Sequence, residues 1–446
     1  MAEAILTSTD PHAAAMAVVG LERAILVTAA DRIARAPSLA VKRFFCRSVW
    51  ASARHVQQIL QTLPPTVATI AGDIDVGPFT RRLMATWGAT VSESAFLVAF
   101  RRIIAPLAAG VYEAATRTGD QAAELCFRRV RLHYERLASA DPSPRDHEDP
   151  CALDGELRAL AELARDYECE AVVSRTRAAT ARSRPPLYAP AREYAIRALR
   201  CGEAREDVWF VSDAADYRRY LHQLVAFEIN TFEACSRHIA EFAWMPWEFH
   251  WDMARQIRDE LRHLEMWLER LPHAGGMLGE WPLGLHEFAI CAGHDLPGRV
   301  ALLERLVEAA ALDGLDLNRC LWESRGDRVM VAYLRRVQDD EIGHVRRGNK
   351  WIRWLCADDA EIAAVVDRAE EESRRRILAA ARELEQAGIV ESGNGELVRR
   401  KFADVFALDV NRTARARAGF SKAEIAREVA RRRARITGMP GDEEIR

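Results

Sequence analysis

Two copies of the motif Asp-Glu-x-x-His constrain this 446-residue chain more than any other feature of its sequence. The first copy spans residues 259–263 and the second spans residues 340–344, and both lie in sequence of helical character. Residues three apart on a helix share one face, so the Glu and His of each copy project together. One such pair offers half of a metal site, and two facing helices would offer most of a dinuclear site.

Each motif is preceded by a helical run that carries a further glutamate. Glu228 lies before the Glu of the first motif, and Glu308 lies before the Glu of the second motif. The number of residues between the two glutamates is almost the same in both cases. This spacing corresponds to one helix, a turn and part of the returning helix. A two-metal carboxylate site in a four-helix bundle needs one Glu from each of two helices and a Glu-x-x-His pair from each of the other two. The predicted metal ligands are Glu228, Glu260, His263, Glu308, Glu341 and His344.

The third helix of this predicted bundle offers two glutamates rather than one. Glu308 fits the repeated spacing, and Glu304 lies one turn earlier on the same helix. Both are candidates for the ligand from this helix.

The residue types in the predicted site indicate which metals it would bind. Carboxylates and imidazoles without a thiolate suit iron or manganese. Four buried carboxylates would be strongly unfavourable without compensating cations, because of mutual repulsion and desolvation. The ligand set also leaves coordination positions free for O₂. We therefore expect two Fe ions, with a Mn/Fe or a Mn pair as the alternative, and O₂ as cosubstrate.

The order of these ligands resembles that of the ferritin-like di-iron carboxylate proteins. The closer resemblance is to an uncharacterised bacterial ferritin-like family of unknown function, and it spans roughly residues 185–430. It depends on four stretches of sequence, at residues 227–233, 259–263, 340–349 and 411–420.

The resemblance also implies what surrounds the metal ligands. In the oxygen-activating members, the Asp before each ligand Glu typically hydrogen-bonds the metal-bound His of the opposite helix. By resemblance, Asp259 would orient His344 and Asp340 would orient His263. Arg262 stands where the superfamily often has an arginine, and it would support these aspartates.

The N-terminal part of the chain, residues 1–140, also predicts a helical bundle, which could be a degenerate copy of the second or an unrelated one. The spacing from Glu22 to His55 is close to the spacing from the first Glu to the first His of the predicted site. Ser52 and Tyr134 fall near the positions where the second half has the glutamates of its two motifs. Without those carboxylates we expect this half to hold no metal and to be structural or regulatory.

The composition, dominated by Ala, Arg, Glu and Leu, predicts an all-α protein of several domains. We expect an N-terminal helical bundle at 1–140, a linker and connecting helix at 141–211, a ferritin-like di-metal bundle at 212–356, and a helical C-terminal extension at 357–446.

Charge and cysteine content exclude several classes of protein. The net charge of −3 predicts no general attraction to nucleic acids or membranes, and the nine cysteines form no CxxC pair. No apolar run is long enough to span a membrane, and the first residues lack the pattern of a signal peptide. We therefore expect a cytoplasmic protein without a membrane partner.

The sequence favours an O₂-dependent oxidoreductase that acts on a small organic substrate. The alternatives are an iron-binding or ferroxidase-like protein, an RNA (tRNA)-modifying hydroxylase, and a degenerate scaffold without metal. An external electron donor or reductase and a homodimer are compatible with the first interpretation. The RNA interpretation depends on a basic C-terminal run that contains Arg427, Arg431, Arg432, Arg433 and Arg435.

Overall fold

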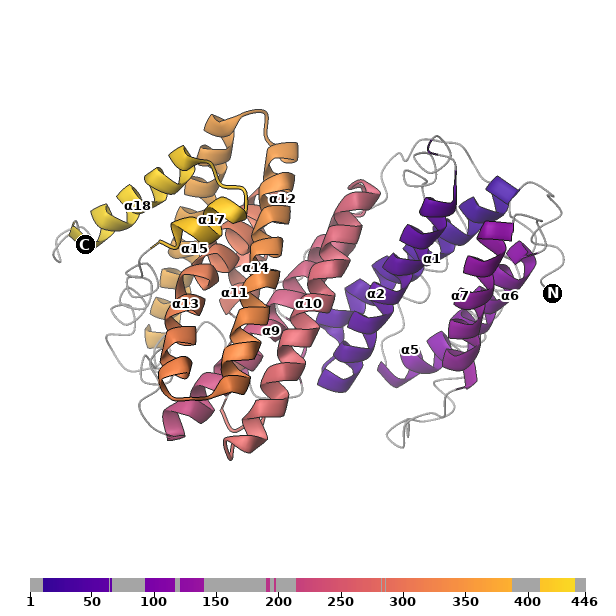
Figure 1. Ribbon diagram of the computed structural model, residues 1–446, viewed down its shortest axis with the longest axis horizontal. Coiled ribbons are helices and arrows are strands. Elements are labelled where there is room, and N and C mark those ends of the chain that lie inside the picture. Colours follow the sequence, from indigo (N-terminus) through magenta and orange to yellow (C-terminus); the bar gives the residue numbers. More distant parts are fainter. Residues whose placement is uncertain are drawn as a thin grey trace. The chain divides into compact units, whose positions relative to one another are not determined.

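The protein has an all-α fold, as its composition predicts (Figure 1). The chain divides into two compact units, of which the first comprises residues 1–185 and 236–255 and the second comprises residues 186–235 and 256–446. Most of the predicted linker, at 141–211, lies outside the described residues. The computed structural model describes residues 11–63, 65, 93–116, 121–139, 190–192, 196–197, 214–281, 283–284, 286–386 and 410–437.

The first unit contains the four helical segments that the sequence predicts before residue 140. The first helix ends just before Pro37, because a residue that precedes proline is disfavoured in the helical conformation. The third segment differs from a plain helix, because it contains a π-helical turn. The elements are α1 (Pro11–Arg35), α2 (Leu39–Thr62), α5 (Glu93–Ala99), the π-helix η2 (Phe100–Ile104), α6 (Ala105–Ala115) and α7 (Gln121–Ser139).

Residues 236–255 belong to this first unit because they pack on its helices. Arg237 forms a buried ion pair with Asp31 of α1. The indole N–H of Trp247 donates to the side-chain oxygen of Gln57 on α2 at 3.1 Å. The stretch at 244–251, which is rich in aromatic residues, therefore anchors the turn between two helices.

The second unit is built on four long helical segments, and the third of these also contains a π-helix. The segments are α9 (Ala214–Glu241), α10 (Trp247–His273), the continuous run α12–η4–α13 (Leu296–Val300, Ala301–Val307 and Glu308–Ser324), and α14 (Arg328–Leu355). The remaining elements are β1 (Ile196–Arg197), which pairs in parallel with β2 (Leu283–Gly284), and the helices α11 (His286–Cys291), α15 (Asp359–Gln386), α17 (Arg412–Arg417) and α18 (Lys422–Thr437).

A tight turn sets the register between α13 and α14. Gly326 has a φ of +73°, in the left-handed region where a glycine ends a helix without steric cost. The next residue, Asp327, caps α14, because its side chain accepts a hydrogen bond from the backbone N–H of Met330 at 2.9 Å. These two residues therefore determine where the second Asp-Glu-x-x-His motif lies relative to the third helix.

The C-terminal stretch at 411–420 packs against the outer side of α13 and α14. Arg415 donates to the buried carboxylate of Asp313 at 2.7 Å and to the backbone oxygen of Ala309 at 3.0 Å. Asn349 of α14 donates to the backbone oxygen of Ala418 at 2.9 Å. The fourth stretch of the family resemblance thus supports the helices that carry the predicted ligands, and residues 357–446 belong to the second unit rather than forming a separate one.

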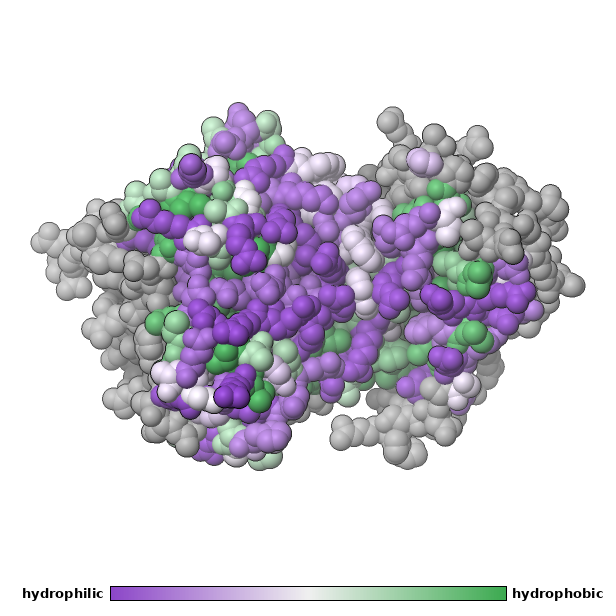
Figure 2. Space-filling model, in the orientation of Figure 1, coloured by the Kyte–Doolittle hydropathy of each residue, from purple (hydrophilic) through white to green (hydrophobic). Residues whose placement is uncertain are grey.

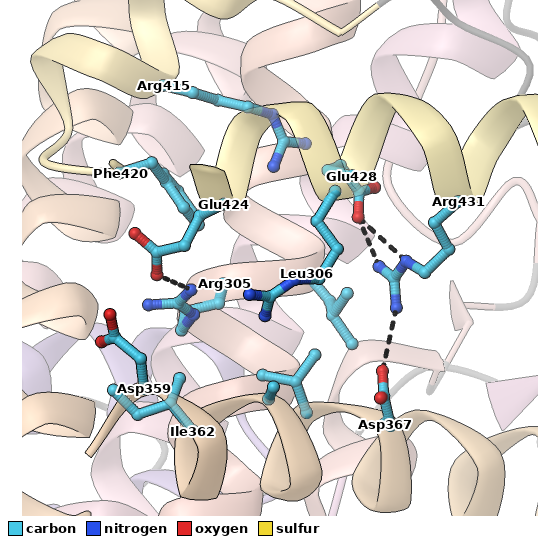
Figure 3. A pocket seen from close by; sticks show the side chains of 13 residues that line it. Arg305, Leu306, Asp359, Ile362, Asp367, Arg415, Phe420, Glu424, Glu428 and Arg431 are labelled. Atoms are coloured by element: carbon cyan, nitrogen blue, oxygen red, sulfur yellow. Dashed lines mark hydrogen bonds and ion pairs between the residues drawn. The ribbon is translucent and has the colours of Figure 1, made fainter. Parts of the chain in front are cut away.

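A cavity lies where α15 and α18 face η4 (Figure 3). Its walls combine aliphatic side chains with ion pairs, among which Arg305 of η4 binds Glu424 at 2.7 Å and Arg431 binds Glu428 at 2.6 Å. Two of the arginines in the basic C-terminal run therefore have partners within the chain, since Arg432 also contacts buried Asp313 at 2.7 Å.

Hydrophilic residues cover much of the visible surface of each unit, with smaller hydrophobic patches between them (Figure 2). Within the described ranges, no helix combines the length and the apolar character that a membrane crossing requires.

Two glycines on α14 provide a matched test of this packing. A Cβ at Gly348 would lie 2.2 Å from the Cβ of Glu304, whereas one at Gly343 would meet only the end of the flexible Arg347 side chain at 3.3 Å. We expect Gly348→Ala to lower the free energy of unfolding by about 1–3 kcal/mol through overpacking. Gly343→Ala should be neutral or should stabilise by up to about 1 kcal/mol through helix propensity. Equal chemical-denaturation midpoints for the two variants would contradict this close approach.

Candidate metal centre

The four long helical segments of the second unit bring all six predicted ligands together in its interior. Each of the six side chains is at most 8% exposed. The contributions are Glu228 from α9, Glu260 and His263 from α10, Glu308 from α13, and Glu341 and His344 from α14. Residues that lie far apart in the sequence therefore share one buried polar cluster.

The two histidines direct the same ring nitrogen, Nδ1, toward the carboxylates. Nδ1 of His263 lies 3.0 Å from Glu260 Oε2, 3.6 Å from Glu341 Oε1 and 3.7 Å from Glu228 Oε2. Nδ1 of His344 lies 3.1 Å from Glu260 Oε1 and 3.0 Å from Glu341 Oε2. Glu260 and Glu341 therefore each direct one oxygen toward each imidazole, which is the arrangement of two carboxylates that bridge a pair of cations.

Two overlapping sets of ligand atoms follow from this geometry. Within each set, one ligand atom of every residue lies within 4.8 Å of the others. The two sets share Glu260, so the ligand atoms could hold two neighbouring cations. The first set is Glu228, Glu260 and His263, and the second is Glu260, Glu308, Glu341 and His344.

The geometry favours Glu308 over Glu304 as the ligand from the third helix. Glu308 belongs to the second set, and its Oε1 accepts a hydrogen bond from Nε2 of Gln256 at 3.0 Å. Glu304 is buried one turn earlier, within the π-helix η4, and it belongs to neither of the two sets.

The aspartates and the arginine lie where the family resemblance implies. Asp340 Oδ2 is 3.2 Å from Nε2 of His263, and Asp259 Oδ2 is 3.5 Å from Nε2 of His344. Arg262 donates through Nη2 to both aspartates. A carboxylate on Nε2 keeps the opposite nitrogen, Nδ1, directed at a metal and increases its basicity. Arg262 therefore ties together the two residues that orient the imidazoles.

Two further side chains, which are not part of the two sequence motifs, donate hydrogen bonds to the glutamates. The indole N–H of Trp267 donates to Glu228 Oε1 at 2.7 Å, and Gln256 binds Glu308 as described above. Trp267 lies four residues after His263, and Gln256 lies four residues before Glu260. Both therefore share the ligand-bearing face of α10, and this spacing is the signal that would have found them.

Burial makes Glu228 and Glu308 hard to ionise without a cation. At Glu260, in contrast, burial is outweighed by His344 and His263, which lower the pKa of that carboxyl. Burial raises the pKa of Glu228 to about 7. Burial and the neighbouring Glu341 and Glu260 raise the pKa of Glu308 well above its usual value. Burial alone would lower the pKa of His263, but Asp340 and the surrounding glutamates raise it instead. The metal-free cluster thus retains protons that cations would displace.

The first unit contains a related polar cluster around Glu22, which is completely buried. Its carboxylate contacts Nδ1 of His55 at 2.9 Å and accepts hydrogen bonds from the hydroxyls of Tyr112 at 2.6 Å and Tyr134 at 2.8 Å. Ser52 interacts with Tyr134. The structure therefore gathers the four residues that the sequence singled out in this half, and it adds Tyr112.

The two units share one further structural feature. In each unit the third helical segment contains a π-helix, η2 in the first and η4 in the second. In the first unit the single carboxylate of Glu22 is satisfied by two tyrosine hydroxyls and an imidazole.

The chain thus combines an all-α fold with a buried cluster of carboxylates and histidines that could hold metal ions. The family model described as "Protein of unknown function (DUF455)" matches residues 156–426, which is more than half of the chain. The chain therefore belongs to the DUF455 family.

One relative in the comparisons is an "Uncharacterized protein" from Haemophilus influenzae (strain ATCC 51907 / DSM 11121 / KW20 / Rd). It is 35% identical over 106 residues, which are 23% of this chain and 37% of the relative. The chain thus matches little more than a third of that relative's length. No solved structure matches the chain.

Replacing one aspartate tests whether these side chains support a metal site. We expect Asp340→Asn to weaken Mn(II) or Fe(II) binding about 10–100-fold, because His263 loses the carboxylate that orients it. Asp339→Asn is a matched control. Asp339 is the residue before Asp340, its side chain is 67% exposed, and among the contacts described it pairs only with the surface residue Arg417. Isothermal titration of metal-free protein measures both affinities. Equal losses in the two variants would argue against this role for Asp340.

Replacing Glu228 tests the electrostatics of the metal-free cluster. The pKa of Glu228 is about 7 in the folded state, whereas its ordinary value is 4.5. Between pH 4.5 and about pH 7 the carboxyl is therefore protonated in the folded state and ionised in the unfolded state. Its contribution to the free energy of unfolding therefore falls as the pH rises through this interval. We expect Glu228→Gln to stabilise the metal-free protein relative to wild type, by on the order of 1–3 kcal/mol near pH 8 and by little near pH 5.

Denaturant unfolding of both proteins at the two pH values measures this difference. Asp259, whose pKa is lowered, is ionised in the folded and unfolded states across this interval and does not contribute to the change. A difference in stability that is the same at both pH values would contradict a raised pKa for Glu228.

Proposed function

We propose that the second unit is a ferritin-like bundle with a non-haem di-iron centre, and that the protein is an O₂-dependent oxidoreductase acting on a small organic substrate. The observation that carries this proposal is the position of Glu260 and Glu341, each of which directs one oxygen toward each histidine Nδ1. This arrangement suits two cations held side by side, with Glu228 and Glu308 at the two ends.

The charge of the cluster supports two divalent ions. Four glutamates carry four negative charges when ionised, and two Fe(II) or Mn(II) ions carry four positive charges. The histidines then act as neutral ligands through Nδ1. Oxygen and nitrogen donors without thiolate match the preferences of iron and manganese. Two bound irons would supply the electrons that reduce O₂ and the sites at which it binds.

The protein side chains hold this set in place and control its protons. Trp267 and Gln256 restrain the two terminal glutamates by donating to them. Asp259, Asp340 and Arg262 keep the imidazoles oriented from outside the cluster. Because all six ligands are buried, the bundle would exclude bulk water from the reaction.

An iron-binding or ferroxidase-like protein is the principal alternative, since the same ligands would oxidise Fe(II) without an organic substrate. The RNA-modifying alternative is less well supported, because Arg431 and Arg432 of the basic run are engaged by acidic residues of the chain. The cavity beside α15 and α18 is not lined by any of the six ligands, so it does not bear on the choice between enzyme and ferroxidase.

Reconstitution with iron tests the proposal. We expect metal-free protein to bind two Fe(II) per chain under anaerobic conditions and to give a transient visible absorption when O₂ is added. With a chemical reductant present, O₂ consumption should continue at a constant two irons per chain. Consumption that stops unless further Fe(II) is supplied would identify a ferroxidase instead.

The control variant is His344→Ala, which removes one ligand and leaves a cavity on α14. It should abolish occupancy by the pair of metals and the absorption change, while circular dichroism reports that the helices persist. Full occupancy in this variant, or no stoichiometric iron or manganese in the wild-type protein, would refute the dinuclear assignment.

A further inference from the structure

Glu304 is a buried carboxylate that the proposed di-iron centre does not use. It is 0% exposed, and neither of its side-chain oxygens makes a hydrogen bond of ordinary geometry within the described part of the chain. The side chain fits against α14 only because residue 348 is a glycine, as a Cβ there would lie 2.2 Å from the Cβ of Glu304. The fold thus makes room for a carboxylate that is completely removed from solvent.

Gln256 of α10 lies between Glu304 and the ligands of the proposed pair. Its Nε2 donates to Glu308 Oε1 at 3.0 Å, on the side of the pair. The carboxamide also lies close enough to the carboxylate of Glu304 to lower its pKa against the effect of burial. Among the residues that the structure describes, Oε1 of Gln256 has no hydrogen-bond partner. Three acceptor oxygens, two from Glu304 and one from Gln256, therefore lack donors in the same part of the interior.

The thiol of Cys235 on α9 lies beside this group. Its Sγ and a carboxylate oxygen of Glu304 are within 4.8 Å of each other, and the cysteine is 0% exposed. A thiolate is a good ligand for borderline transition metals, and none of the six ligands of the proposed pair offers sulfur. Oxygen and sulfur donors from three different helical segments thus converge next to the pair.

Burying acceptors without donors costs free energy, and that cost grows when the group is ionised. Arg347 of α14 is a nearby cation, but its Nε and Nη2 also lack hydrogen-bond partners, so these atoms do not satisfy Glu304. A proton shared between Glu304 and Gln256 would satisfy one oxygen of each residue. A cation would satisfy all three oxygens and the sulfur together.

We propose that Glu304, Gln256 and Cys235 bind a third divalent transition-metal ion, adjacent to the di-iron centre but distinct from it. The ion would be bound by the carboxylate, the carboxamide oxygen and the thiolate. Binding releases the thiol proton to solvent, so that one carboxylate and one thiolate balance the two positive charges of the ion. This site goes beyond the proposed oxidase function and has its own ligands.

Titration of the metal-free protein with Co(II) tests the third site without any assay of activity. We expect three equivalents per chain, with the third bound more weakly than the first two. Only a Co(II) ion with a thiolate ligand gives an intense near-ultraviolet charge-transfer band, and this band should rise with one equivalent of the three. Glu304→Gln should reduce the capacity to two, and Cys235→Ser should remove the band.

Matched controls separate loss of the site from loss of the fold. Glu287→Gln changes another buried glutamate of the same unit, one that already accepts a hydrogen bond from Asn230 at 2.7 Å. Cys356→Ser changes another buried thiol of that unit, one whose charged neighbours include Glu361 and Arg305 rather than Glu304. Both variants should bind three Co(II) ions and keep the near-ultraviolet band.

Other outcomes distinguish this inference from the proposed function. Two Co(II) per chain in both wild type and Glu304→Gln, without the band, would overturn the third site and leave the di-iron centre intact. A fall from two to one in Glu304→Gln would make Glu304 a ligand of the pair and would also overturn it. A single ion that His344→Ala keeps and Glu304→Gln loses would support the third site and refute the di-iron centre. No bound Co(II) in the wild type would refute both.

Discussion

The concentration of carboxylates in the interior of the second unit is the constraint on which the rest of the site depends. Four glutamates and two histidines share a region from which water is excluded, so their charges need compensation from protons or cations. Several neighbouring polar groups reduce the cost of burying these charges. Trp267 and Gln256 donate to the terminal glutamates, and Arg262 joins the aspartates that face the imidazoles. Glycine at position 348 even leaves space for a further carboxylate.

The first unit also buries a carboxylate, but it compensates the charge differently. There a single buried carboxylate, Glu22, is satisfied by two tyrosine hydroxyls and an imidazole. Because neutral donors replace the other acidic groups, no excess negative charge accumulates. The two units therefore differ in how a buried polar cluster is compensated. In the first unit hydrogen bonds satisfy the carboxylate, whereas the excess negative charge in the second unit could be balanced by cations.

Local periodicity explains why so much of the site could be predicted from the sequence. Glu260 and His263 share a helical face whatever surrounds them, and so do Glu341 and His344. The similar spacing to Glu228 and Glu308 reflects the length of a helix and its return. Other features depend on packing between helices, which sequence spacing does not encode. The π-helix η4, the contact of Glu304 with Gly348 and the donors from Tyr112 and Gln256 belong to this group.

The sequence by itself determined the helical class, the two ligand pairs and the glutamates that precede them, because each follows from interactions within one helix or from the length of a hairpin. Only the tertiary structure decided that Glu308 rather than Glu304 joins the second ligand set, and that Glu260 and Glu341 lie between the two imidazoles. Two glutamates one turn apart are equivalent along a helix. They become different only when a neighbouring helix places a histidine beside one and a glycine beside the other.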